Sequence, residues 1–106
     1  MLNLGRISLV LLFFPLTLAA AEARLNWTPP TRNTDGTALT NLAGYVIQHR
    51  QKGTTTWKVR NIPYPGQTTA VIRYLPAGAT WQFRMKSFNN LGVRSNPTAI
   101  VEKKLL

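Results

Sequence analysis

The chain of 106 residues has no cysteine, a single histidine and only three acidic residues. The lack of cysteine excludes disulfides, a thiol nucleophile, a Cys-ligated zinc site and a lipidated cysteine anchor. General acid–base catalysis needs two titratable groups at one site, but Asp35 falls in a turn and Glu102 near the C-terminus. His49 shares an alternating face with Tyr45 and Ile47, which favours a partly buried structural histidine. The sequence therefore predicts a protein that is not an enzyme and has no catalytic residue, cofactor or metal site.

The first residues differ from the rest of the chain. Arg6 is the only charge before an apolar run over residues 7–21, and small residues follow it as Ala19-Ala20-Ala21-Glu22-Ala23. These features predict a secretory signal peptide over residues 1–23, cleaved after Ala21 or Ala23. The alternative is an uncleaved membrane anchor, although a spanning helix needs ~20 apolar residues and this run contains Pro15. We expect a secreted or periplasmic protein.

Residues 24–106 lack helical periodicity and show short runs rich in β-branched and aromatic residues. Turn residues such as Asp35-Gly36 and Pro63 separate these runs. The predicted strands cover residues 24–28, 44–51, 56–62, 67–75, 80–88 and 98–104. Short strands at such regular spacing favour one all-β domain, an antiparallel β-sandwich.

Five motifs in this order resemble those of a fibronectin type III domain, in particular a small secreted single-domain member of bacterial type. They are Leu25-x-Trp27-x-Pro29-Pro30, Leu42-Ala43-Gly44-Tyr45-x-Ile47, Trp57, Leu75-Pro76-Ala77-Gly78-x-Thr80-Trp81-x-Phe83-Arg84-Met85, and Asn89-Asn90-x-Gly92 with Ser95-Asn96-Pro97. The resemblance implies an immunoglobulin-like sandwich in which strands A, B and E pack against C′, C, F and G. Trp27 is expected to fill the centre of the core, with aromatic and aliphatic residues of strands C and F around it: Tyr45, Ile47, Trp81, Phe83 and Met85.

The sequence departs from this family pattern in two places. Trp81 stands where family members carry the tyrosine whose hydroxyl ties the E–F corner, so we expect packing to hold this corner instead. Strand A would fall within the signal peptide, so cleavage is expected to remove it and leave strand B as an edge. A free edge can pair with a partner strand or a second copy. The alternative is that Pro29-Pro30 protects this edge.

The formal net charge of +10 is the strongest functional signal. Strict alternation along strands C, C′ and F places Trp57 and Val59 inside and five cations together on the outer face of one sheet. This predicted basic face comprises Arg50, Lys58, Arg60, Arg84 and Lys86, and Lys103 and Lys104 extend it. Such a surface attracts anionic groups, although a positive charge can also serve solubility alone.

The F–G loop supplies a second candidate contact, with Leu91 and Val93 as exposed apolar tips next to Arg94; the alternative is an ordinary turn. Together these features predict a secreted, non-catalytic binding or structural module of the cell envelope or extracellular space that contacts a protein or glycan partner. The alternative function is electrostatic binding of polyanions through the basic face. Candidate polyanions are anionic polysaccharide, lipopolysaccharide, lipid headgroups and nucleic acid, without base-specific recognition of the nucleic acid.

Overall fold

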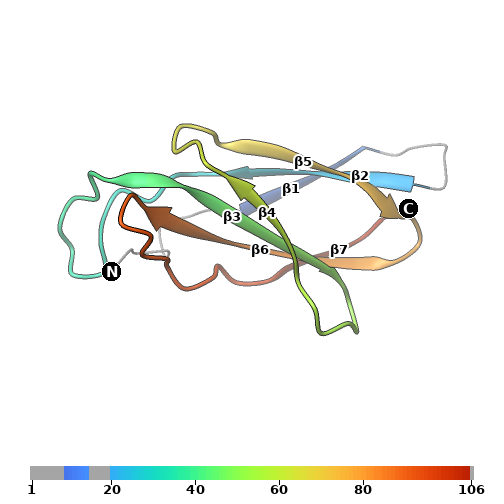
Figure 1. Cartoon of the computed structure of the whole chain (residues 1–106). Helices are drawn as coiled ribbons and strands as arrows, with labels where there is room; N and C mark the ends of the chain where they lie inside the picture. The colour runs from blue at the N-terminus through green and yellow to red at the C-terminus, as the bar shows by residue number, and fades with distance from the viewer. Residues whose placement is uncertain (1–8, 15–19, 106) are drawn as a thin grey trace.

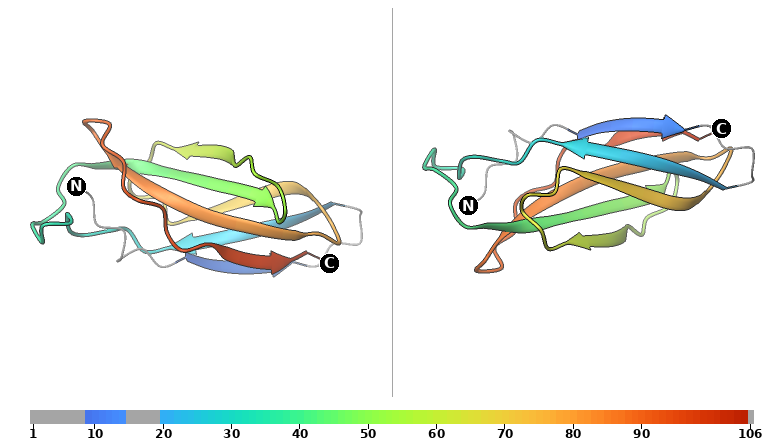
Figure 2. Two further views of the ribbon diagram at one scale, coloured as in Figure 1. Left: turned by 90° about the horizontal axis from the view of Figure 1, so that it is seen from below. Right: turned by 90° about the horizontal axis from the view of Figure 1, so that it is seen from above.

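The computed structural model describes residues 9–14 and 20–105, and places seven strands in two antiparallel sheets (Figure 1). The strands are β1 (Leu9–Phe14), β2 (Ala20–Trp27), β3 (Leu42–Gln51), β4 (Lys58–Ile62), β5 (Thr69–Pro76), β6 (Thr80–Asn89) and β7 (Val101–Lys104). One sheet has the order β1-β2-β5 and the other β4-β3-β6-β7. Figure 2 shows the four-stranded sheet from below and the three-stranded sheet from above. The predicted all-β sandwich and its A-B-E and C′-C-F-G arrangement are thus confirmed.

The alternation expected for half-buried strands is clearest along β6. Trp81, Phe83, Met85 and Ser87 are buried, and the residues between them are partly exposed. Strand β2 shows the same period of two, because its buried residues are Ala21, Ala23, Leu25 and Trp27. Side chains that alternate between two faces gather the apolar ones between the sheets.

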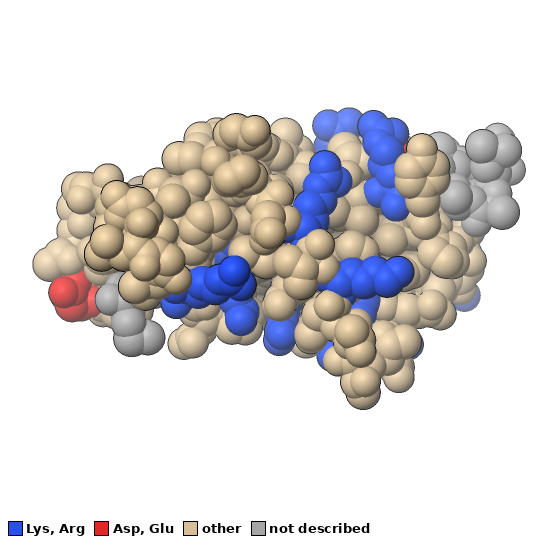
Figure 3. Space-filling view, in the orientation of Figure 1, with Lys and Arg blue, Asp and Glu red and all other residues tan. Residues whose placement is uncertain are grey.

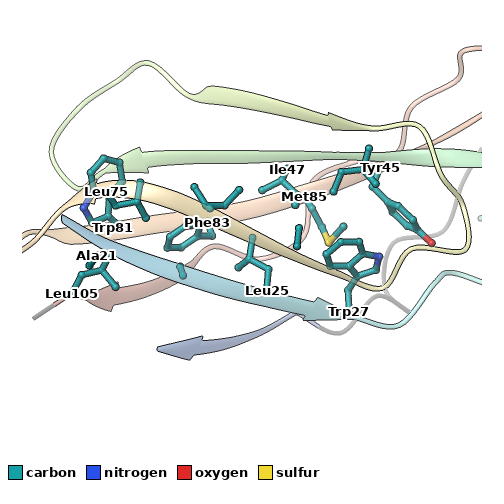
Figure 4. Close-up of a cluster of buried hydrophobic side chains, with 14 residues drawn as sticks. Ala21, Leu25, Trp27, Tyr45, Ile47, Leu75, Trp81, Phe83, Met85 and Leu105 are labelled. Atoms are coloured by element: carbon teal, nitrogen blue, oxygen red, sulfur yellow. The ribbon is translucent and has the colours of Figure 1, made fainter. Parts of the chain in front are cut away.

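The core runs the length of the sandwich (Figure 4). Leu25 and Phe83 are fully buried near its middle. Trp27 lies nearer one end than the predicted centre, where its ring packs edge-on against Tyr45 with centroids 5.3 Å apart. Burial raises the pKa of Tyr45, and its hydroxyl donates to the Pro65 carbonyl oxygen at 2.9 Å.

Strand β1 corresponds to strand A and lies inside the predicted signal peptide, where the sequence placed strand A. It pairs along β2 from Leu9 opposite Trp27 to Phe14 opposite Glu22, so β2 is not an edge in the full chain. An apolar extended segment next to an open sheet edge satisfies the backbone groups of that edge. The core also includes Ala21 and Ala23, which precede the predicted domain boundary. Cleavage of the leader and self-association through the β2 edge stay predictions. Across residues 9–14 and 20–105 there is no helix with the length and apolarity to span a membrane.

The corner between β5 and β6 is held by a hydrogen bond, and the prediction of packing alone is wrong. The indole Nε1 of Trp81 donates to the Pro76 carbonyl oxygen at 3.2 Å. The family's tyrosine forms a bond of the same kind with its hydroxyl. A tryptophan at this position therefore retains a donor directed at the chain upstream of the corner.

Substituting Trp81 with phenylalanine is expected to cost about 1 kcal/mol for the lost hydrogen bond, in addition to the smaller buried area. Trp81→Tyr is the matched variant, because its hydroxyl can restore a donor at the corner. Urea denaturation of both variants should give the tyrosine protein the higher free energy of unfolding. Equal stabilities would show that the indole hydrogen bond contributes nothing measurable.

Candidate functional site

The outer face of the four-stranded sheet carries a row of long polar side chains from β3 and β6. The β3–β6 register places Gln48 opposite Arg84 and Arg50 opposite Gln82. Directly opposed residues project to the same face, and the buried Ile47 and Met85 define the other face. Lys86 belongs to the same outer face because it alternates with Met85. The structure thus brings Arg50, Arg84 and Lys86 together as predicted.

The Trp57 ring contacts two arginines of the outer face, Arg50 and Arg84, and the prediction that it faces the core is wrong. The guanidinium carbon of Arg50 is 4.0 Å from the centroid of the Trp57 ring, and that of Arg84 is 4.2 Å from it. Both distances are within the range of cation–π contacts, each worth about 0.5–1 kcal/mol at an exposed site. We call Arg50, Trp57 and Arg84, with their glutamine partners Gln48 and Gln82, the Arg–Trp ladder.

Hydrogen bonds that the guanidinium groups donate to the two glutamines fix both arginine side chains. Arg50 Nε donates to Gln82 Oε1, and Arg84 Nε donates to Gln48 Oε1, both at 2.7 Å. Gln82 Nε2 in turn donates to Glu102 Oε2 at 2.7 Å. Each arginine uses its Nε in the ladder, so its terminal nitrogens can serve an incoming acceptor.

Glu102 is the one acid on the ladder face among the described residues. The hydrogen bond from Gln82 and the nearby charge of Lys52 hold the pKa of Glu102 below its usual value. The Lys52 ammonium is 3.4 Å from the carboxylate, with both groups exposed, so this ion pair adds little stability. Glu102 therefore stays ionised at neutral pH and fixes the Gln82 end of the ladder.

Lys58 and Arg60 do not lie on this face, in contradiction to the predicted basic face. The β3–β4 register sets Lys58 opposite His49 and Arg60 opposite Ile47, on the side that faces the other sheet. Val59, predicted inside, is instead exposed on the outer side, at 56%. The predicted set of five cations is thus divided into Arg50, Arg84 and Lys86 on one side of the sheet and Lys58 and Arg60 on the other.

The position of β4 at the sheet edge explains this difference. An edge strand can turn charged side chains inward because the opposite sheet does not fully cover it. Arg60 shows the result, since its Nη1 donates to the Val71 carbonyl oxygen of β5 at 2.6 Å. The residue that fills the core from β4 is Ile62, which is 3% exposed.

Lys103 and Lys104, near the C-terminus, lie on opposite sides of β7. In the β6–β7 register Lys104 lies opposite Thr80 and Lys103 opposite Trp81. Lys104 therefore extends the ladder face, and Lys103 projects from the other side of β7. Figure 3 shows basic side chains in several groups on the side of the molecule where β4 and β5 lie. The positive charge is thus distributed over more than one surface.

The F–G loop presents the apolar tips predicted for it, with Leu91 79% and Val93 41% exposed. The side chain of Asn89 shapes the loop, because its Oδ1 accepts hydrogen bonds from the backbone N–H groups of Leu91 and Val93, each at 3.0 Å. Arg94 is exposed and forms an isolated bridge with Phe88. This loop is therefore a fixed turn that presents two apolar side chains beside one cation.

His49 lies at the rim of the core as predicted. Its ring is close to those of Trp81 and Phe83, with centroids 6.0 and 6.4 Å away. Burial lowers the pKa of His49, and the charges of Lys58 and Arg60 lower it further. Its buried Nδ1 has no hydrogen-bond partner. Within the part of the chain that the structure describes, no group of three or more acids, histidines or cysteines forms a metal site.

Comparison with solved structures identifies the fold. A structure described as "Myokine structure" superposes with a TM-score of 0.62 at 14% identity, over 88% of this chain and 90% of that chain. The third fibronectin III domain of the human KIAA0343 protein superposes with a TM-score of 0.68 at 10% identity, over 92% of this chain and 78% of that chain. No family model matches the sequence. The chain therefore has the fold of a fibronectin type III-like β-sandwich.

Proposed function

We propose that this protein is a secreted, non-catalytic binding module whose Arg–Trp ladder contacts anionic groups of a protein or glycan partner at the cell envelope or outside the cell. The observation that supports this most is that two guanidinium groups share the ring of Trp57. Ordering a long side chain on binding costs about 0.5–1.5 kcal/mol. Arginines that are already held by a ring and by glutamines avoid part of that cost.

Guanidinium is well suited to this contact because its planar donors match carboxylate, sulfate and phosphate oxygens. Lys86 and Lys104 lie on the same outer face and add positive charge around the ladder. The apolar tips Leu91 and Val93 of the F–G loop are available for a partner surface. A leader over residues 1–23 would deliver the domain to a compartment where anionic glycans and lipid headgroups occur.

The test compares two variants of equal net charge on a heparin oligosaccharide. Arg50→Gln/Arg84→Gln removes the ladder cations, and Arg32→Gln/Lys103→Gln removes two cations that lie away from the ladder. We expect the ladder variant to bind about tenfold more weakly, equivalent to about 1.4 kcal/mol. For this variant the slope of the logarithm of the binding constant against the logarithm of the salt concentration should also become shallower by about 1.5, because two cations no longer displace counterions.

The two variants also separate this proposal from the alternative. Equal losses in both would favour sequence-blind attraction of polyanions by the net charge of +10. No loss in the ladder variant would contradict the proposal. Thermal melts of both proteins verify that the fold persists.

A further inference from the structure

A groove opens between β4 and β5, the edge strands that face each other from the two sheets. Its volume is about 430 Å³. The residues that line it include two arginines, a histidine, a tyrosine and aliphatic residues of β5: Arg60, Arg73, His49, Tyr74, Val71 and Ile72. The groove is on the opposite side of β4 from the Arg–Trp ladder.

The charges around this groove are predominantly positive. Arg60 and Arg73 line the groove, Lys58 lies near His49, and Glu22 is the acid that pairs with Arg73, 2.9 Å from its Nη1. Arg60 is held toward β5 by its bond to the Val71 carbonyl oxygen, which uses one of its five N–H groups. The lining of this partly apolar hollow therefore holds two guanidiniums and no acid.

His49 adds a polar group without a partner to this groove. Its Nδ1 is buried and has no hydrogen-bond partner, and its ring is among the lining side chains. Burial, together with Lys58 and Arg60, lowers the pKa of His49, so the imidazole is neutral at neutral pH. A neutral imidazole carries one donor and one acceptor nitrogen. A buried polar atom without a partner has an energetic cost that a bound ligand can offset.

We propose that the groove between β4 and β5 is a binding site for a phosphate group, with Arg60 and Arg73 as its charged walls and His49 as a third polar contact. A phosphate group matches the two guanidiniums of the lining, because its oxygens accept paired N–H bonds from guanidinium. Val71 and the Tyr74 ring offer apolar surface to the organic part of a phosphate ester. This inference is independent of the proposed function, because it uses other residues on another surface.

The single histidine makes the experiment simple. In the untagged full chain, the imidazole Cε1–H proton gives one NMR resonance that reports on His49 alone. Inorganic phosphate is titrated against sodium chloride at matched ionic strength, with glycerol phosphate as a parallel arm. We expect phosphate to move this resonance saturably and to raise the pKa of His49, because an anion offsets the charges of Lys58 and Arg60. Glycerol phosphate tests whether the source is a free phosphate or an ester.

Three substitutions test whether Arg60 and Arg73 bind the phosphate. Arg73→Gln is expected to weaken phosphate binding about tenfold, because it removes a charge-assisted hydrogen bond. The Arg73 side chain is 61% exposed, so its loss should leave the fold intact. Arg60→Gln should have a similar effect, and Glu22→Gln should strengthen binding because Arg73 then loses its competing carboxylate.

The matched control is Arg32→Gln, which removes one charge from an exposed loop and should bind phosphate as the parent does. The proposal is overturned if neither phosphate nor its ester moves the His49 resonance beyond the chloride control. It is also overturned if Arg73→Gln and Arg32→Gln bind phosphate equally well. In either case the inward cations of β4 would serve only to protect a sheet edge.

Discussion

Replacing Phe83 with alanine is expected to lower the free energy of unfolding by about 3–5 kcal/mol, the usual cost of emptying a buried aromatic site. Phe83 projects from β6 and is fully buried in the middle of the core. Small domains have only about 5–15 kcal/mol of stability in total, and this chain has no disulfide to compensate. Urea denaturation followed by tryptophan fluorescence measures the change.

The matched control for Phe83→Ala is Val59→Ala. Val59 is 56% exposed on the outer face of β4, so its truncation should change stability by no more than about 0.5 kcal/mol. Phe83→Leu should retain more stability than Phe83→Ala because it leaves a smaller cavity. A loss below 1 kcal/mol for Phe83→Ala would mean that the sandwich core is not packed as described.

The sequence predicts the central strands well because their side chains alternate between core and solvent. Trp81, Phe83 and Met85 lie inside, and Arg84 and Lys86 lie on the other side of β6, as expected. In a strand with neighbours on both sides and a sheet packed over one face, a slip of one residue would expose every apolar side chain. Burial therefore specifies the face of each residue.

The same reasoning fails on β4, which is an edge strand. Trp57 and Val59 occupy odd-numbered positions and Ile62 an even-numbered one. In a regular strand these three apolar residues cannot all face the core, so the sequence allows two opposite orientations of the strand. In the structure Ile62 is the residue that is buried, and Lys58 and Arg60 therefore point inward on the same side of β4. The even-numbered position of Ile62, shared with Lys58 and Arg60, was the available signal for this arrangement. It would also have placed Trp57 beside Arg50 and Arg84, the contact that sequence reasoning missed.

Two other differences come from contacts that are distant in the sequence or depend on geometry. The indole of Trp81 reaches the Pro76 carbonyl oxygen only because the β5–β6 turn brings the two together. The groove between β4 and β5 joins residues of two sheets that never pair. Neither arrangement has a local sequence pattern, because alternation specifies the face of a side chain but not what lies across from it.

Replacing Gly44 with alanine is expected to cost about 3 kcal/mol, the upper part of the usual range for overpacking. Gly44 is buried next to an irregularity in the β3–β6 register. A Cβ added there would overlap the carbonyl oxygen of Ile62, which belongs to the backbone of β4, and lie 2.8 Å from Phe88 Cζ. The end of β4 would have to move away from β3 to admit a methyl group.

The backbone contact gives this prediction a sharp test. Adding Phe88→Ala to Gly44→Ala removes the ring but not the Ile62 oxygen, so the double variant should not regain the stability lost to Gly44→Ala. Gly66→Ala is the matched control, because no atom lies within 4 Å of its added Cβ, and it should be neutral or slightly stabilising. Full recovery in the double variant would show that the Phe88 ring, and not the close approach of β3 and β4, requires glycine at position 44.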